Sequence, residues 1–72
     1  MGNKQAIMVP RASFWGLSDK WTVQQLIDWF FATYPDEIGE RKPNARIIRQ
    51  GKVLGEWDRL EDGETVVVDN VE

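Results

Sequence analysis

The chain has 72 residues, of which 42% are hydrophobic and 29% charged, and its formal net charge is −3. This composition is typical of one small globular domain, residues 1–72, rather than of a disordered segment. The sequence has neither cysteine nor histidine, which excludes disulfides, thiolate metal sites and cysteine nucleophiles and removes the commonest general base.

These exclusions lead to a first prediction of function class. We expect a protein that is not an enzyme and that binds no metal or cofactor. No apolar run is long enough to span a membrane, and the first ten residues, MGNKQAIMVP, lack the apolar core of a signal peptide. We therefore expect a soluble, cytoplasmic protein.

The N-terminal part of the chain is predicted to form a β-hairpin. Residues 5–9, QAIMV, are β-formers that end at Pro10, and residues 12–17, ASFWGL, are typical of a second strand. Pro10 and Arg11 supply the turn. Gly16 within the second run indicates a bulge or a close backbone approach.

The stretch WTVQQLIDWFFATYP predicts an amphipathic helix. Thr22 and Gln25 have the spacing of a capping box, in which each side chain bonds to the main-chain N–H of the other residue. Pro35 ends the helix near Tyr34. Apolar residues recur at helical spacing and form one broad stripe that comprises Val23, Leu26, Ile27, Phe30, Phe31 and Tyr34.

The C-terminal half is predicted to contain three more strands. A charged connection over residues 36–43 leads into ARIIRQGKVL, which is typical of two short strands around the turn Gln50-Gly51-Lys52. After an irregular stretch, the turn dipeptide Asp62-Gly63 introduces a last strand, ETVVVDNV.

The order of these elements predicts a two-layer α+β domain, because one amphipathic helix can cover one face of a small sheet. The last strand is expected in the centre of the sheet, beside the first strand and parallel to it. Its unbroken run Val66-Val67-Val68 suits a covered strand better than an edge strand.

Three stretches also carry a family resemblance: WTVQQLIDWF in the helix, IIRQGKVLGEW in the hairpin, and LEDGETVVV at the last turn and strand. Their order and spacing, over residues 21–68, resemble the β-grasp, ubiquitin-like fold, and most of all the small sulfur carriers of thiamine and molybdopterin biosynthesis. The resemblance implies a ββαββ arrangement with a mixed sheet and one main helix.

The end of the chain departs from that family. The sulfur carriers end in a flexible Gly-Gly tail, whose carboxylate is adenylated and converted to a thiocarboxylate. Here DNVE follows the last strand, and no glycine follows Gly63. We therefore favour a ubiquitin-like protein-interaction module. The alternative is a sulfur carrier whose Gly-Gly tail is missing or lies beyond Glu72.

The candidate binding surface is the open face of the sheet. Adjacent strand residues point to opposite faces, so Ile48 faces outward if Ile47 packs inward. The resemblance implies that this face is the docking surface, and an apolar centre with a polar rim suits an interface. We predict that its nucleus consists of Arg46, Ile48, Arg49 and Val53.

Three tryptophans extend the prediction. Trp29 lies off the helical stripe, so it is either half-buried against a loop or an exposed anchor for a partner. Trp15 alternates with Phe14 in the predicted strand, so one of the two faces away from the helix. Trp57 either caps the core or extends the exposed surface.

Charge distribution bears on the partner. Residues 41–52 contain five basic residues and no acidic one, whereas residues 53–72 contain seven acidic residues and one basic. This is either an ordinary polar surface or a basic stripe that meets an acidic protein. A single-stranded nucleic acid is a third alternative, weakened by the negative net charge. The exposed apolar residues would also permit a homodimer.

Overall fold

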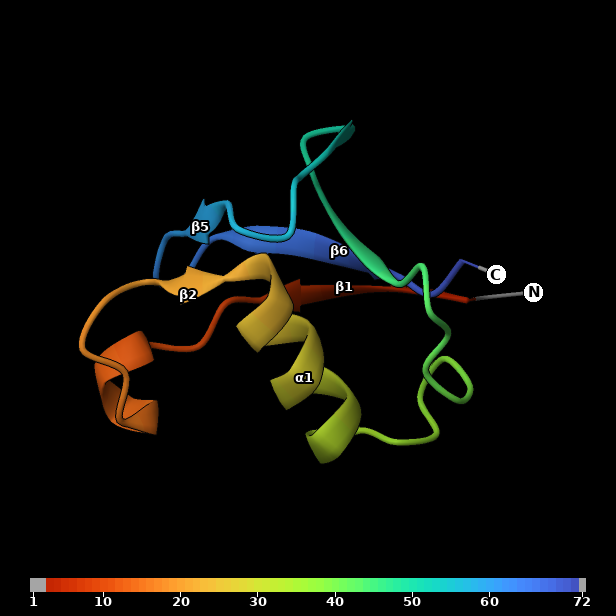
Figure 1. Ribbon diagram of the computed structural model, residues 1–72, viewed down its shortest axis with the longest axis horizontal. Helices are drawn as coiled ribbons and strands as arrows, with labels where there is room; N and C mark the ends of the chain where they lie inside the picture. The colour runs from red at the N-terminus through yellow and green to blue at the C-terminus, as the bar shows by residue number, and fades with distance from the viewer. Residues whose placement is uncertain (1–2, 72) are drawn as a thin grey trace.

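The computed structural model describes residues 3–71 and has one main helix and a four-stranded sheet (Figure 1). The sheet order is β1-β6-β3-β4, and β2 and β5 form a separate two-stranded ribbon. The predicted small α+β architecture is confirmed. In chain order the elements are β1 (Lys4–Met8), the 3-10 helix η1 (Ala12–Trp15), β2 (Trp21–Thr22), α1 (Val23–Thr33), β3 (Arg46–Arg49), β4 (Lys52–Val53), β5 (Arg59–Leu60) and β6 (Thr65–Asp69).

The last strand, β6, lies between β1 and β3, so its predicted central position is confirmed. Its predicted direction is wrong: β1 and β6 are antiparallel, with Lys4 opposite Asp69 and Met8 opposite Thr65. The turn before β6 docks on the end of β1, where the Val9 N–H donates to the Glu64 carbonyl at 2.8 Å. Because this contact joins the end of β1 to the start of β6, the two strands must run in opposite directions.

The predicted second strand is also wrong, because residues 12–15 form η1 instead. The Ala12 N–H donates to the Asp62 carboxylate at 3.0 Å. Gly16 then closes the turn at φ 80°, and the Leu17 N–H donates to the Ala12 carbonyl at 3.0 Å. A left-handed glycine is a common way to end a helical turn and does not continue a strand.

Helix α1 agrees with its prediction. The Thr22 hydroxyl accepts from the Gln25 N–H at 3.1 Å, while the Gln25 side chain accepts from the Thr22 N–H at 3.0 Å, which completes the capping box. The helix ends at Thr33, just before Tyr34 and Pro35.

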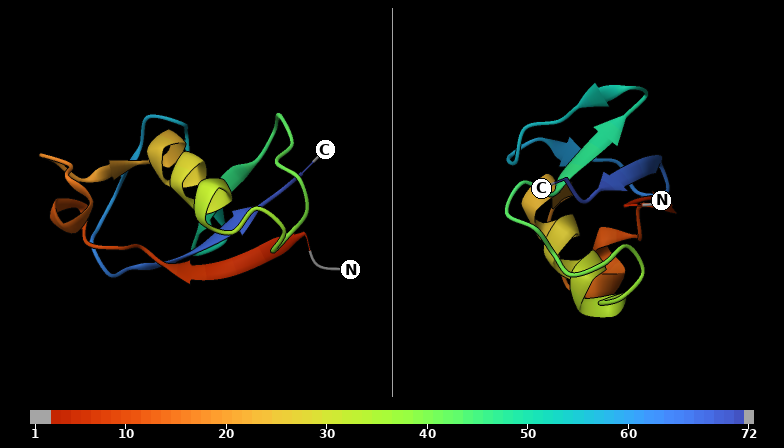
Figure 2. Two further views of the ribbon diagram at one scale, coloured as in Figure 1. Left: turned by 90° about the horizontal axis from the view of Figure 1, so that it is seen from below. Right: turned by 90° about the vertical axis from the view of Figure 1, so that its right-hand side faces the viewer.

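The core lies between α1 and one face of the sheet (Figure 2). From the sheet, Ile47, Val66 and Val68 are fully buried beneath the helix. Burial of each such side chain contributes about 1.5–3 kcal/mol. The helix contributes Val23, Leu26, Ile27, Phe30 and Phe31.

Two connections fix the rest of the chain. The predicted β3–β4 hairpin turns at Gln50 and Gly51, whose φ values of 50° and 79° suit a two-residue hairpin turn. At the other end of the sheet, buried Asn70 donates to the carbonyls of Ile38 and Glu40 and accepts from the Lys42 N–H. The charged connection is thereby held against the end of β6.

Candidate functional site

The register of the sheet assembles an apolar row on the face opposite α1. Ala6 lies opposite Val67, Val67 opposite Ile48, and Ile48 opposite Val53, so the row crosses all four strands. Ala6 and Val53 are exposed, and the two residues between them are half-buried. We call these four residues the open-face row. Among residues 3–71, no helix covers them (Figure 2).

A charged row borders the open-face row. Lys4, Asp69 and Arg46 lie side by side across β1, β6 and β3. The Arg46 Nε donates to the Asp69 Oδ2 at 3.2 Å, and Asp69 is only 1% exposed. Its Oδ1 is buried and has no hydrogen-bond partner in the part of the chain that the structure describes. Arg46 therefore lies beside Ile48, and the ion pair with Asp69 engages one side of its guanidinium group.

Arg49 lies apart from the other three predicted residues, because alternation along β3 directs it to the helix side of the sheet. Its Nε and Nη2 donate to the two carboxylate oxygens of Glu64, both at 2.7 Å. Nη2 also donates to the Arg59 carbonyl at 2.9 Å. The hydrogen bond from Arg49 is the main cause that lowers the pKa of Glu64, against the opposing effect of burial.

The predicted basic stripe is largely paired with acidic residues from other segments. Arg46 pairs with Asp69 and Arg49 pairs with Glu64. A third arginine, Arg41, pairs with Asp28 on α1. This pairing favours the ordinary polar surface over a continuous basic stripe.

Trp29 is the centre of an aromatic cluster, which we define as Phe14, Trp15, Trp29 and Tyr34. The Trp29 ring lies 5.9 Å from that of Trp15 and 6.0 Å from that of Tyr34, and Phe14 adds a contact to Trp15 at 6.0 Å. Trp29 itself is half-buried, whereas Phe14 is 80% exposed. The cluster therefore presents an aromatic surface to solvent beside buried Trp21, whose ring lies 5.9 Å from Trp29.

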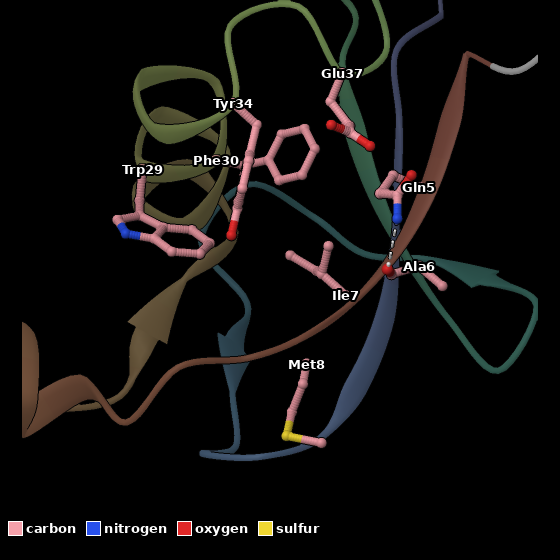
Figure 3. Close-up of a pocket in the computed structure, with 8 residues that line it drawn as sticks. All are labelled: Gln5, Ala6, Ile7, Met8, Trp29, Phe30, Tyr34 and Glu37. Atoms are coloured by element: carbon pink, nitrogen blue, oxygen red, sulfur yellow. Dashed lines mark hydrogen bonds between the residues drawn. The ribbon is translucent and has the colours of Figure 1, made fainter.

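A groove of about 320 Å³ separates β1 from α1 (Figure 3). Ile7 points across it toward Phe30 and Tyr34, and the Glu37 carboxylate points toward Gln5. Met8 points away, in agreement with strand alternation. The complete lining is Gln5, Ala6, Ile7, Met8, Trp29, Phe30, Tyr34 and Glu37.

The seven predicted site residues thus fall into separate places. Trp57, in the loop between β4 and β5, is 74% exposed and has no ring contact within residues 3–71, so it does not cap the core. The open face carries Arg46, Ile48 and Val53, the aromatic cluster carries Trp15 and Trp29, and Arg49 and Trp57 lie apart from both sets.

The sequence predicted that one of Phe14 and Trp15 faces away from the helix, whereas both are exposed. Sequence reasoning missed Tyr34 as an exposed aromatic residue, and it missed Ala6 and Val67 as members of the open-face row. Tyr34 continues the apolar stripe of the helix in sequence but is 44% exposed, and its position beside Pro35 is a signal that it lies at the end of the helix. Ala6 and Val67 could not be placed without the register of β1 on β6.

The described residues offer no metal site: no three acidic side chains between residues 3 and 71 are grouped so as to hold an ion. Nor does any helix in this range have the length and apolar character needed to cross a bilayer.

Comparison with known proteins gives no match to a family model, to a curated protein or to a solved structure. The interpretation of the surfaces therefore rests on their own geometry.

Proposed function

We propose that the chain is a small non-catalytic protein-interaction module and that the open face of its sheet is the docking surface. The observation that carries this proposal is the open-face row, four neighbouring apolar side chains on a sheet face that no helix covers within residues 3–71. A contiguous apolar strip with a charged border suits a protein partner, because its burial removes apolar area from water while the rim stays solvated.

The charged residues that border the open-face row indicate what kind of partner surface would fit. Lys4 is exposed, and Arg46 keeps 43% of its side chain accessible although it pairs with Asp69. Both cations lie on the same face as Ile48. A partner with an apolar centre and an acidic rim would match this surface.

The proposal does not depend on a β-grasp topology. One helix across a sheet with a central last strand supports that assignment. The antiparallel pairing of β1 with β6 and the presence of η1 in place of a second strand oppose it.

Substitution of Ile48 tests the docking surface. In a pull-down from cell extract, wild type captures its partner proteins. We expect Ile48→Asp to capture at least about tenfold less of these same proteins, because the substitution places a charge in the centre of an apolar contact. Ala32→Asp is the control, since Ala32 is exposed on the solvent side of α1. Circular dichroism verifies that both variants fold. Equal capture by wild type and Ile48→Asp would contradict the proposal.

The sulfur-carrier alternative has less support. Asn70 is completely buried and bonded to residues 38–42, so the chain remains part of the fold to this point. A carrier incubated with ATP, an activating enzyme and a sulfur donor would gain the mass of a thiocarboxylate. The module that we propose gains none.

A further inference from the structure

Strand β1 has a free edge: among residues 3–71 it pairs with β6 on one side and with no strand on the other. The Val9 N–H and the Asn3 carbonyl bond toward β6. By the alternation of an antiparallel ladder, the N–H and C=O groups of Lys4, Ala6 and Met8 therefore face outward. The Gln5 side chain reaches the Ala6 carbonyl at 3.3 Å, a long bond from the strand's own residue.

This edge lacks the usual protection against strand pairing. Between Lys4 and Met8 there is no proline and no bulge, and the five residues pair with β6 in continuous register. Lys4 is the one charged residue of the strand and lies at its start. Such an edge is a template for a further strand.

The groove beside the edge determines which side chains an added strand could have. Side chains of an added strand on the helix side would lie next to Gln5 and Ile7, two residues apart. The position next to Ile7 faces Phe30 and Tyr34, which favours an apolar side chain (Figure 3).

The other position is electrostatically distinct. Next to Gln5, the added side chain faces the carboxylate of Glu37, which has no ion-pair partner within residues 3–71. Glu37 is the one charged residue in the lining of the groove. A lysine or arginine at this position would complement it.

We propose that β1 and the groove bind an extended segment of a partner protein that carries a basic residue two positions from a β-branched or aromatic residue. The mode is strand addition, in which main-chain hydrogen bonds supply affinity and the groove supplies selectivity. A second copy of β1 fits less well, because it would place Gln5 and Ile7 on the helix side and no cation near Glu37. The inference rests on the proposed function as a protein-binding module but uses a different surface.

The test uses an acetylated and amidated peptide, Thr-Lys-Thr-Val-Thr-Lys-Thr, titrated into the ¹⁵N-labelled chain and followed by NMR. A lysine on both sides of the valine suits either strand direction. We expect the largest amide shifts at Lys4, Ala6 and Met8. The peptide with glutamate in place of lysine should bind about fivefold more weakly, the range of a partly exposed ion pair.

Two variants test the two parts of the site. Glu37→Lys should reverse the preference between the lysine and glutamate peptides. Ala6→Pro should weaken binding about tenfold, because it removes an outward N–H that the fold does not use, whereas Ala6→Val keeps this donor. Ile48→Asp should leave peptide affinity unchanged, since Ile48 lies on the other face of the sheet.

The outcomes separate this inference from the open-face proposal. No binding of the lysine peptide, equal binding of both peptides, or a dimer of the free chain that Ala6→Pro dissociates would each overturn the inference. If the lysine peptide does not bind but Ile48→Asp still reduces protein capture, the inference about the edge is wrong and the open-face proposal is retained. If the peptide binds as expected while Ile48→Asp captures normally, the open-face proposal is wrong and the edge site stands.

Discussion

At the scale of single residues, Arg49 and Glu64 form a bidentate ion pair. Glu64 accepts two hydrogen bonds from one guanidinium and a third from the Glu61 N–H at 2.6 Å. The Glu64 side chain is 18% exposed, so the pair is less screened than the surface pair of Lys20 and Glu61. It joins β3 to the turn that precedes β6.

This pair predicts a pH-dependent stability. The pKa of Glu64 is lowered from an ordinary value of 4.5 in the folded protein, mainly by Arg49. The stabilisation is therefore complete above pH 4.5 and is lost as the pH falls through the lowered pKa. Glu64→Gln should reduce the free energy of unfolding by about 1–2 kcal/mol at pH 7.

Urea unfolding at pH 7 and pH 3 measures the effect, with exposed Glu56 replaced by Gln as the control. The difference between wild type and Glu64→Gln should narrow at the lower pH. A difference that stays constant, or that grows as the pH falls, would show that the carboxylate of Glu64 is not the stabilising form.

Asn70 is a second residue whose side chain holds a distant segment of the chain in place. Its amide satisfies two carbonyls and one N–H of the segment 38–42, and it is fully buried. Asn70→Ala leaves these groups without their partner, so we expect a loss of about 2–3 kcal/mol in unfolding free energy.

Hydrogen exchange locates this loss. The Lys42 amide should lose protection in Asn70→Ala much more than the amide of Val66, because only the former bonds to the Asn70 side chain. Equal loss at both amides would indicate that Asn70 acts through global stability alone.

At the scale of elements, the sequence predicted well where the signals are local. Thr22 and Gln25 are three residues apart and make both bonds of the capping box. Gln50 and Gly51 determine the β3–β4 hairpin through their own backbone conformation. In both cases the residues that direct the structure lie within the element itself, so no distant contact had to be known.

Prediction from the sequence failed where a contact with a residue far away in the chain determines the local structure. Residues 12–17 include the β-formers Phe14 and Trp15, but the Ala12 N–H bonds to Asp62, 50 positions away in sequence. The direction of β6 relative to β1 likewise depends on a contact between Val9 and Glu64. Alternation along β3 correctly placed Ile48 on the open face, whereas the contact between Trp15 and Trp29 was not predicted because it depends on η1.

The 3-10 helix gives a prediction at this scale. Gly16 has φ 80°, a conformation that a side chain strains, so Gly16→Ala should cost about 1 kcal/mol in stability. It should also change the tryptophan fluorescence, because η1 holds Trp15 against Trp29.

Gly55→Ala is the matched control, since Gly55 has no positive φ and an added Cβ would meet Asp58 at an ordinary 3.6 Å. If Gly16→Ala proves as stable as wild type and retains its fluorescence, then the closed 3-10 turn is not required by the fold.

At the scale of the whole molecule, burial is concentrated on one side of the sheet. Ile47, Val66 and Val68 are covered by α1, while the open-face row has no cover within residues 3–71. One helix cannot cover both faces of a sheet. The remaining apolar surface, together with the free edge of β1, is the physical basis of our proposal that the chain acts by binding.

Photo-crosslinking tests this account most directly. A photoreactive phenylalanine derivative is placed at position 53, in the open-face row, or at position 32, on the solvent side of α1. In cells, we expect discrete cross-linked protein adducts from position 53 and none from position 32. Adducts of equal yield and identity from both positions, or adducts from position 32 alone, would contradict the claim that partners dock on the open face.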